Sequence, residues 1–328
     1  MKLPQLVIVT PALRAANNGN WQTAQRWAHW LRSHYRVRLQ TDWSAGDEDL
    51  MIALHARRSA AAVAAWRERR GAAPLLLVLT GTDLYRDIDA DPAAQRSLVL
   101  ADRLVVLNEL GAARLPAQLR AKTIVGLQSC PPRAQRAKTT RHLRALMVGH
   151  LREEKDPQTY FEAARLLAPR SDILLDHIGG ALDPALAAQA TELMQTQPRY
   201  RWLGALPHAA ARARIAAAHV LVHASRMEGG AHVVIEAIAS GTPVLASRID
   251  GNLGLLGSNY GGVFEPGDAA GLATLLQHAR DDPAMLAGLR RSCQARAPLF
   301  LPDRERQTLL ACVAGLLSTS TPVNAAAP

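Results

Sequence analysis

Glu228 and Glu236 are two carboxylates whose spacing suggests that they bind hydroxyl groups. Gly229, Gly230 and an apolar run lie between them, and Gly241 ends the run. This pattern predicts a strand, a Gly-rich turn, a helix beginning at the glycine pair, and another strand. Glycine lets a ligand approach the free N–H groups of a helix N-terminus, where the helix dipole favours a phosphate. A carboxylate accepts hydrogen bonds from paired hydroxyls, so either glutamate could hold a sugar or ribose diol.

Residues 225–247, SRMEGGAHVVIEAIASGTPVLAS, resemble the E-x7-E signature of retaining, nucleotide-sugar-dependent glycosyltransferases. These are GT-B proteins of the glycosyltransferase 4 group. The resemblance implies that Glu228, with the amides of Gly229 and Gly230, holds the donor sugar. It also implies that Glu236 holds the ribose hydroxyls of UDP. A buried helix with one solvent-facing glutamate would explain the apolar run, but not two carboxylates that flank the turn.

Arg152 and Lys155 form a second candidate site, because they follow a predicted strand at residues 145–149. Asp156 and Pro157 come next and give the N-cap and first-turn signal of a helix. Cations at this point could clamp a diphosphate, with arginine as a fork and lysine as a point charge. The alternative is that they pair on the surface with the acidic residues 153–154.

The family resemblance extends to this segment, where relatives carry Gly-Arg-Leu followed by a lysine. Here His150 replaces the arginine, whereas Lys155 matches. Relatives also place the nucleotide base near the loop that begins at Gly179. The expected nucleotide-sugar site consists of His150, Arg152, Lys155, Gly179, Glu228, Gly229, Gly230 and Glu236. Within this site we expect Glu228, Lys155 and Arg152 to be catalytic, mainly by stabilising the sugar and the departing diphosphate.

Polar loops after two other predicted strands, residues 6–10 and 75–79, suggest an acceptor side. Ligands of open parallel sheets bind at the carboxyl ends of strands. The first loop also suits an ordinary turn with Asn20 as the N-cap. His232 stands where relatives have an apolar residue, and either a functional or a structural imidazole fits it. The expected acceptor-side residues are Asn17, Asn18, Gly19, Asn20, Thr82, Asp83 and His232.

Strand and helix signals alternate throughout, which predicts an α/β protein with two doubly wound, Rossmann-like domains. The resemblance implies a GT-B fold, in which these domains face each other across a cleft. We expect an N-terminal acceptor-side domain at residues 1–130 and a linker at 131–141. A nucleotide-sugar-binding domain follows at 142–297. A helix at 298–317 is expected to pack back on the first domain, before a disordered tail at 318–328.

The 328 residues carry a formal net charge of +10, which favours anionic partners. The arginines are scattered without interleaved aromatics, so we expect small anionic substrates rather than nucleic acid. Three cysteines without a CxxC pair argue for a reducing, cytoplasmic setting. No run approaches the ~20 apolar residues of a spanning helix. We expect no cofactor and no metal site, because we find neither HExxH nor paired cysteines, and the metal dependence of the activity stays open.

Four segments together resemble a narrower family, the selenosugar synthases of selenoneine biosynthesis: NNGNWQTAQRWAHWL, LTGTDLYRDI, VGHLREEKDP and SRMEGGAHVVIEA. This resemblance implies transfer from a UDP-sugar, such as UDP-N-acetylglucosamine, to selenophosphate. A lipid or oligosaccharide acceptor at a membrane is the alternative, since the basic, Trp-containing residues 26–38 could lie on anionic lipid. A nucleic-acid-binding protein would offer no reason for the two glutamates. The preferred sugar, the anomeric outcome and the oligomeric state stay open.

Overall fold

The computed structural model describes residues 3–13 and 19–319, which contacts between Cα atoms divide into two compact units. The first unit comprises the chain up to Gln128 and again from Pro302, and the second comprises Ser129–Leu301. The expected linker at residues 131–141 therefore belongs to the second unit, where it runs without helix or strand. Of the expected disordered tail, residues 318 and 319 are helical, and residues 320–328 lie outside the described part.

The described part of the first unit contains a parallel sheet of six strands in the order β2-β1-β3-β4-β5-β6. The strands are β1 Gln5–Val9, β2 Arg36–Gln40, β3 Leu50–Leu54, β4 Leu75–Leu79, β5 Arg103–Val106 and β6 Thr123–Val125. Four of the central strands are almost entirely apolar, as expected for a sheet covered on both faces. Strand β2 was not predicted, because arginines alternate with its apolar residues; it lies at the edge of the sheet.

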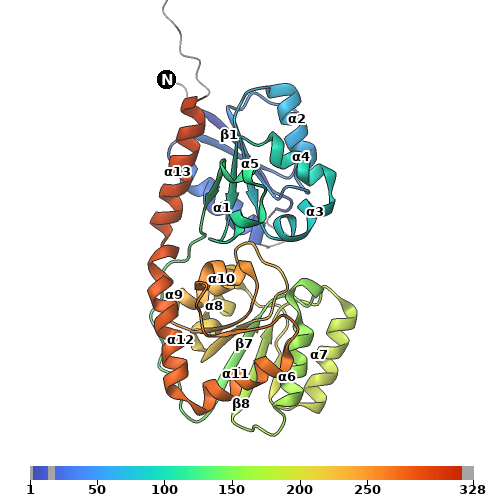
Figure 1. Cartoon of the computed structure of the whole chain (residues 1–328), viewed down its shortest axis with the longest axis vertical. Coiled ribbons are helices and arrows are strands. Elements are labelled where there is room, and N and C mark those ends of the chain that lie inside the picture. The colour runs from blue at the N-terminus through green and yellow to red at the C-terminus, as the bar shows by residue number, and fades with distance from the viewer. Residues whose placement is uncertain (1–2, 14–18, 320–328) are drawn as a thin grey trace, which may run out of the picture. The chain divides into compact units, whose positions relative to one another are not determined.

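Helices cover both faces of this first sheet (Figure 1). They are α1 Gly19–Leu31, α2 Ala60–Arg70, α3 Ile88–Ala90, α4 Pro92–Leu100, α5 Ala117–Arg120 and α13 Pro302–Thr319. Alternate residues of β1 point to opposite faces. Val7 packs in one core cluster with Trp66 of α2, whereas Ile8 packs in the other with Trp27 of α1. The first unit is thus a three-layer α/β structure, as predicted.

The C-terminal helix α13 packs against α1 within the first unit. Its Glu305 is 3% exposed and accepts hydrogen bonds from Trp27 Nε1 (2.7 Å) and Arg26 Nε (3.0 Å). Leu309 and Val313 join the same core cluster as Trp27. A segment almost 280 residues from α1 in the sequence therefore completes one face of the first sheet.

The described part of the second unit also contains six parallel strands, in the order β12-β11-β10-β7-β8-β9. They are β7 Leu143–Val148, β8 Ile173–Ile178, β9 Tyr200–Trp202, β10 Val220–His223, β11 Val244–Ser247 and β12 Val263–Phe264. The chain starts in the middle at β7, runs outward through β8 and β9, and returns to β10 beside β7. This is the doubly wound arrangement, and the point where the strand order reverses lies between β7 and β10.

The helices of the second unit are α6 Pro157–Leu166, α7 Pro184–Thr196, α8 His208–Ala217, α9 His232–Ala239, α10 Asp250–Leu256, α11 Ala269–Asp281 and α12 Pro283–Arg296. Helix α11 packs against α6 and contacts β7 and β8, whereas α8 and α9 pack together and contact β7 and β10. Both predicted doubly wound domains are therefore confirmed. Among the described helices, none has the length and apolar character needed to cross a bilayer.

His177 on β8 is a fully buried histidine in the core of the second unit. Its Nε2 donates to the Gly149 carbonyl (3.1 Å), and its Nδ1 lies 3.1 Å from the Tyr200 hydroxyl. Burial lowers the pKa of His177 to about 4, against the opposing effect of the Gly149 hydrogen bond. The imidazole is therefore neutral in the folded protein at pH values where an unfolded chain would protonate it.

We expect the second unit to lose stability on acidification below pH 6.5 because of His177. The unfolded state takes up a proton near pH 6.5, whereas the folded state does so only near pH 4, so stability falls as pH falls between these values. Between pH 7.5 and pH 5 the loss amounts to about 2 kcal/mol. Hydrogen exchange of β8 peptides, corrected for intrinsic rates, measures it. His177→Gln should remove this loss and His29→Gln, at an exposed site, should not; an unchanged loss in His177→Gln would contradict the assignment.

Candidate functional site

The candidate site lies in the second unit, at the carboxyl ends of β7 and β10. These strands are direct neighbours, with Met147 paired to Val222. The loop after β7 contains Arg152 and Lys155, and the loop after β10 contains Glu228. Ligands of doubly wound sheets bind outside the carboxyl ends of strands at the point of reversal. The two candidate motifs of the sequence therefore meet at the position where this fold binds ligands.

Three interactions join the two loops. Lys155 Nζ donates a hydrogen bond to Glu228 Oε1. Arg226 contributes twice, because its amide donates to the Glu154 carbonyl (3.0 Å) and its Nε lies 3.3 Å from Asp156 Oδ2. Lys155 thus pairs with the distant Glu228 rather than with a neighbouring acidic residue. Asp156 is the N-cap of α6, as predicted, and its side chain accepts a hydrogen bond from the Thr159 amide.

Glu228 is held as a carboxylate in a nearly buried position, with its side chain 13% exposed. Burial alone would raise the pKa of Glu228, but the charge of Lys155 and a contact with His223 outweigh it and hold the pKa well below its usual range. His223 Nε2 lies 3.4 Å from Glu228 Oε1, and the ring is buried. Burial lowers the pKa of His223, so this ring favours its neutral form. The sequence analysis missed His223, which reads as the last residue of an apolar strand.

Arg152 supplies a cation whose Nε atom is buried and has no hydrogen-bond partner among the described residues. A buried guanidinium nitrogen without a partner is costly, and an anionic ligand would satisfy it. No ion pair of Arg152 within 4 Å is found in residues 3–13 and 19–319. The position of Arg152, in the same loop as Lys155, therefore suits the expected role in binding a diphosphate.

His150 and Gly179 lie next to these residues, at the ends of β7 and β8. His150 Nδ1 accepts a hydrogen bond from the Gly180 amide (3.0 Å). Burial, Arg152 and Lys155 lower the pKa of His150, which favours the neutral form of its ring. A Cβ atom on Gly179 would lie 1.8 Å from the Gly149 carbonyl oxygen, and the Gly179 amide and carbonyl are both hydrogen-bonded within the protein. Gly179 thus permits close approach of the strand ends, a packing role that the sequence analysis did not foresee.

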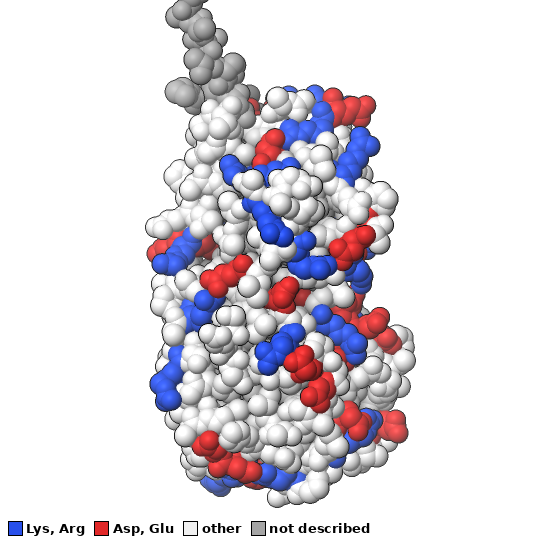
Figure 2. Space-filling model, viewed as in Figure 1, with Lys and Arg blue, Asp and Glu red and all other residues white. Residues whose placement is uncertain are grey.

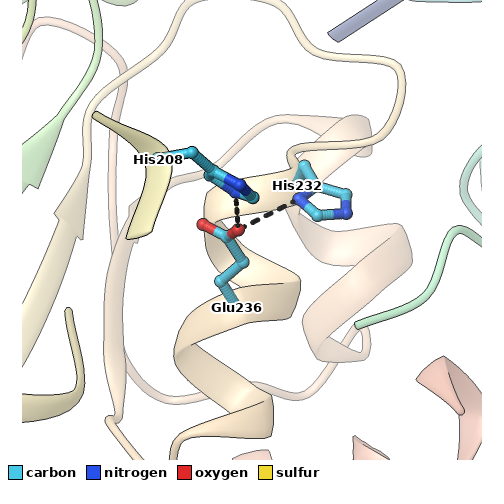
Figure 3. Close-up of side chains that lie close together, drawn as sticks. All are labelled: His208, His232 and Glu236. Atoms are coloured by element: carbon cyan, nitrogen blue, oxygen red, sulfur yellow. Dashed lines mark hydrogen bonds and ion pairs between the residues drawn. The ribbon is translucent and has the colours of Figure 1, made fainter. Parts of the chain in front are cut away.

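Glu236 lies in a separate cluster with two histidines (Figure 3). Its Oε1 atom is 2.6 Å from His208 Nε2 and 3.5 Å from His232 Nδ1, and Arg212 Nε is 3.5 Å from the same oxygen. Burial alone would raise the pKa of Glu236, but hydrogen bonds from His208 and His232 hold it at about 2. Glu236 is therefore ionised at every physiological pH.

The glycine pair Gly229–Gly230 precedes the helix rather than opening it. Helix α9 begins at His232, so the predicted start at the glycines is corrected by two residues. Its N-cap, Ala231, has no side chain that can bond to the free amides, whereas Asp156 and Asp183 cap α6 and α7. An uncapped helix N-terminus leaves N–H groups for an anion. This geometry agrees with a phosphate beside Gly229 and Gly230.

The sequence profile of the family described as "Glycosyl transferases group 1" matches residues 132–299, slightly more than half of the chain and nearly all of the second unit. The chain belongs to the group 1 glycosyl transferases. No curated protein sequence is significantly similar to it.

Solved structures of other proteins resemble this glycosyl transferase over nearly its whole length. Sucrose-phosphate synthase from Thermosynechococcus elongatus is 18% identical, with 97% of this chain and 100% of that chain covered and a TM-score of 0.76. HepE from Anabaena, in complex with UDP and glucose, is 16% identical over 95% and 100% of the two chains (TM-score 0.75). A UDP-forming α,α-trehalose-phosphate synthase from Burkholderia xenovorans is 14% identical over 83% and 75% (TM-score 0.68). At these identities the likeness establishes the fold, which is the expected GT-B fold.

The residues expected on the acceptor side of this glycosyl transferase lie in several different places. Asn17 and Asn18 lie outside the described residues, whereas Gly19 and Asn20 form the start of α1. Asp83 is fully buried and accepts hydrogen bonds from backbone amides of residues 56, 80 and 81, so its carboxylate shapes its own loop and does not face a ligand. His232 belongs to the Glu236 cluster in the second unit.

Thr82 is paired with a histidine that the sequence analysis overlooked. Its hydroxyl lies 3.1 Å from His55 Nε2, while the Arg58 amide donates to His55 Nδ1 (3.3 Å). His55 has a φ of 75°, which is uncommon for a residue with a side chain and marks local strain. The loop after β4 contains no histidine in its first residues, Thr80–Asp83. The structure brings one to Thr82 from the end of the neighbouring strand β3.

Gly251, at the start of α10, lies against the loop that carries Glu228. A Cβ atom at Gly251 would lie 2.0 Å from the backbone oxygen of Glu228. The position therefore requires glycine, because any side chain would displace the backbone of the catalytic candidate. This contact was not apparent from the sequence, in which the two residues are 23 positions apart.

Proposed function

We propose that this glycosyl transferase transfers a sugar from a UDP-sugar. The observation that carries the proposal is the junction of Lys155 and Glu228 at the point where the strand order of the second sheet reverses. In this proposal Arg152, Lys155, the free amides of α9 and the carboxylates of Glu228 and Glu236 bind separate parts of one UDP-sugar. HepE, a similar structure, was solved with UDP and glucose, and a second similar protein is a UDP-forming synthase.

The proposed division of labour follows from the chemistry of each group. Arg152, Lys155 and the N-terminus of α9 stabilise the negative charge that develops on the departing diphosphate. Glu228 holds the sugar and favours positive charge at its ring, since the carboxylate stays ionised. Glu236 accepts hydrogen bonds from the ribose diol. His150 takes the place of the usual arginine of relatives, and its lowered pKa favours a neutral imidazole there.

For the acceptor, we propose selenophosphate, with the product a 1-selenosugar. The support is the resemblance of four sequence segments to the selenosugar synthases, together with the surplus of positive charge. Selenium attacks C1 of the sugar as the bond to UDP breaks and UDP leaves with the bonding electron pair. Water then cleaves the P–Se bond, giving the selenosugar and phosphate. The substrate carries the selenium, so the chemistry needs no cysteine.

A lipid or oligosaccharide acceptor is the second candidate. It is favoured by the basic residues 26–38, but Arg26 and Trp27 in this segment are bound to Glu305 of α13. Nucleic acid is a weaker candidate. On the face drawn in Figure 2, Lys and Arg side chains are interspersed with Asp and Glu rather than gathered in one patch. The proposal therefore names small anionic molecules as the partners.

UDP release from UDP-N-acetylglucosamine, with and without selenophosphate, tests the proposal. The expected result is selenophosphate-dependent release with a product that shows the selenium isotope pattern by mass spectrometry, and its loss in Glu228→Ala. Slow UDP release at a rate that does not depend on selenophosphate would contradict selenophosphate as the acceptor, but would still support a UDP-sugar as the donor. Neither release nor binding of any UDP-sugar would count against the donor as well.

Gly251→Ala is expected to lower the rate of UDP release at least tenfold. The added methyl group would collide with the Glu228 carbonyl, and a backbone contact of this kind is relieved only by moving the loop. Gly315→Ala is the matched control, because a Cβ atom there meets nothing within 4 Å. Steady-state kinetics decide the outcome, and equal rates in the two variants would show that the loop tolerates the change.

A further inference from the structure

His208, His232 and Glu236 form a set of metal-ligand atoms around one point (Figure 3). His208 Nε2, His232 Nδ1 and one Glu236 oxygen all lie within 4.8 Å of one another. The two nitrogens are 2.6 and 3.5 Å from Glu236 Oε1. Ligands of tetrahedral Zn²⁺, each at 2.0–2.1 Å from the ion, lie roughly 3.3 Å apart. Small side-chain shifts would therefore place all three atoms on one ion, with the fourth position open.

The hydrogen bond on the far side of His232 orients this ring as a metal ligand. Its Nε2 atom lies 3.1 Å from the Ser129 carbonyl oxygen, which only accepts, so Nε2 carries the proton. The other ring nitrogen, Nδ1, faces the Glu236 carboxylate at 3.5 Å and is the atom that would bind an ion. Metal-bound histidines commonly donate their other N–H to a carbonyl in this way.

The scaffold is also suitable for an ion. His232 and Glu236 are four residues apart on α9 and so share one face of the helix. His208 is the first residue of α8, which packs against α9. Glu236 is 3% exposed, whereas the His208 side chain is 48% exposed. The site therefore combines a fixed, buried carboxylate with an open side through which an ion can enter.

We infer that these three side chains bind a divalent transition-metal ion of the Zn²⁺ class. Arg212 Nε lies 3.5 Å from the same Glu236 oxygen, so the carboxylate charge is already partly balanced. Mg²⁺ and Ca²⁺ depend on several oxygen ligands and are poorly served by one such carboxylate. Zn²⁺, Co²⁺ and Ni²⁺ bind imidazole strongly, and two imidazoles are present.

The ion and the nucleotide exclude each other, a consequence that rests on the proposed role of Glu236 in holding the ribose. A carboxylate bound to an ion cannot also accept hydrogen bonds from a diol through the same oxygen. The site would thus make the enzyme sensitive to free zinc.

Isothermal titration of the full chain with ZnCl₂, in the absence of nucleotide, tests the site. We expect one site in the wild type and at least tenfold weaker binding in His208→Ala and in His232→Ala. His34→Ala, at an exposed histidine of the first unit, should bind as the wild type does. Co²⁺ should give the visible absorption of tetrahedral ligation, and MgCl₂ should give no binding. Equal zinc affinity in the wild type and both cluster variants would overturn the inference.

Titration with UDP, with and without zinc, tests the competition. Zinc should weaken UDP binding to the wild type by more than it does in His208→Ala, where the residual effect reports only zinc bound by UDP in solution. An equal effect in both would overturn the competition. If UDP does not bind even without zinc, the proposed nucleotide site is wrong, and the competition with it. The nucleotide-free titration still decides the metal site by itself.

Discussion

Replacing Lys155 by alanine is expected to lower kcat/KM for sugar transfer by roughly 10²–10³-fold, as is usual when one preorganised charge is removed from a leaving group. The lysine also balances the charge of Glu228, so the loss should change the pH profile. Without Lys155, burial raises the pKa of Glu228 from its lowered value. A decline in rate on the acid side should therefore appear at higher pH in the variant than in the wild type.

Lys138→Ala is the control for this experiment. Lys138 is also a partly buried lysine of the second unit, but its Nζ bonds to the Thr242 hydroxyl (3.2 Å). Its replacement should leave the rate within a factor of about three, since distant substitutions have small effects on the site. A Lys155→Ala enzyme that keeps its rate would refute the assignment. A lower rate with an unchanged acid side of the pH–rate profile would mean that Lys155 stabilises the diphosphate but does not set the pKa of Glu228.

Glu236→Gln is expected to weaken UDP binding by about 10- to 100-fold. A hydrogen bond to a charged group contributes about 1.5–3 kcal/mol, and glutamine keeps the shape while it loses the charge. The comparison ligand is 2′,3′-dideoxy-UDP, which lacks the diol. The wild type should bind UDP much more tightly than the dideoxy analogue, whereas the variant should bind both with similar affinity. Isothermal titration of both proteins with both ligands measures the difference.

Glu192→Gln serves as the matched control, because Glu192 is an exposed glutamate on α7 of the same unit. It should discriminate between the two ligands as the wild type does. If Glu236→Gln prefers UDP over the dideoxy analogue as strongly as the wild type does, Glu236 does not bind the ribose hydroxyls. Another side chain of the site would then have to bind the ribose diol.

Most helices and strands of this fold were predictable, because each depends mainly on the residues within its own segment. Apolar runs marked the buried parallel strands, and Asp156 with Pro157 marked the start of α6. The edge strand β2 was not predicted, because its sequence alternates arginine with apolar residues and lacks the continuous apolar run of a central strand. The start of α9 was placed too early, since glycine permits a helix start but does not require one.

The pairings within the site were not predictable, because they depend on which strands become neighbours. Lys155 meets Glu228 only because β10 returns beside β7. The partners of Glu236 come from α8 and from its own helix, so His208 carried no local signal. His223 and His55 lie at the ends of apolar strands, so the sequence offered no reason to treat them as site residues. Single residues could be proposed from type and spacing, but their partners needed the topology.

The packing of α13 on α1 has a consequence for synthesis of the protein on the ribosome. The first unit lacks the Trp27–Glu305 contact and one side of its core until the last helix emerges. The 173 residues from 129 to 301 are translated in between, which takes roughly 9–35 seconds at 5–20 residues per second. During that interval the apolar side chains that α13 covers in the finished unit are exposed and open to chaperones. The unit that begins first is therefore the one that is finished last.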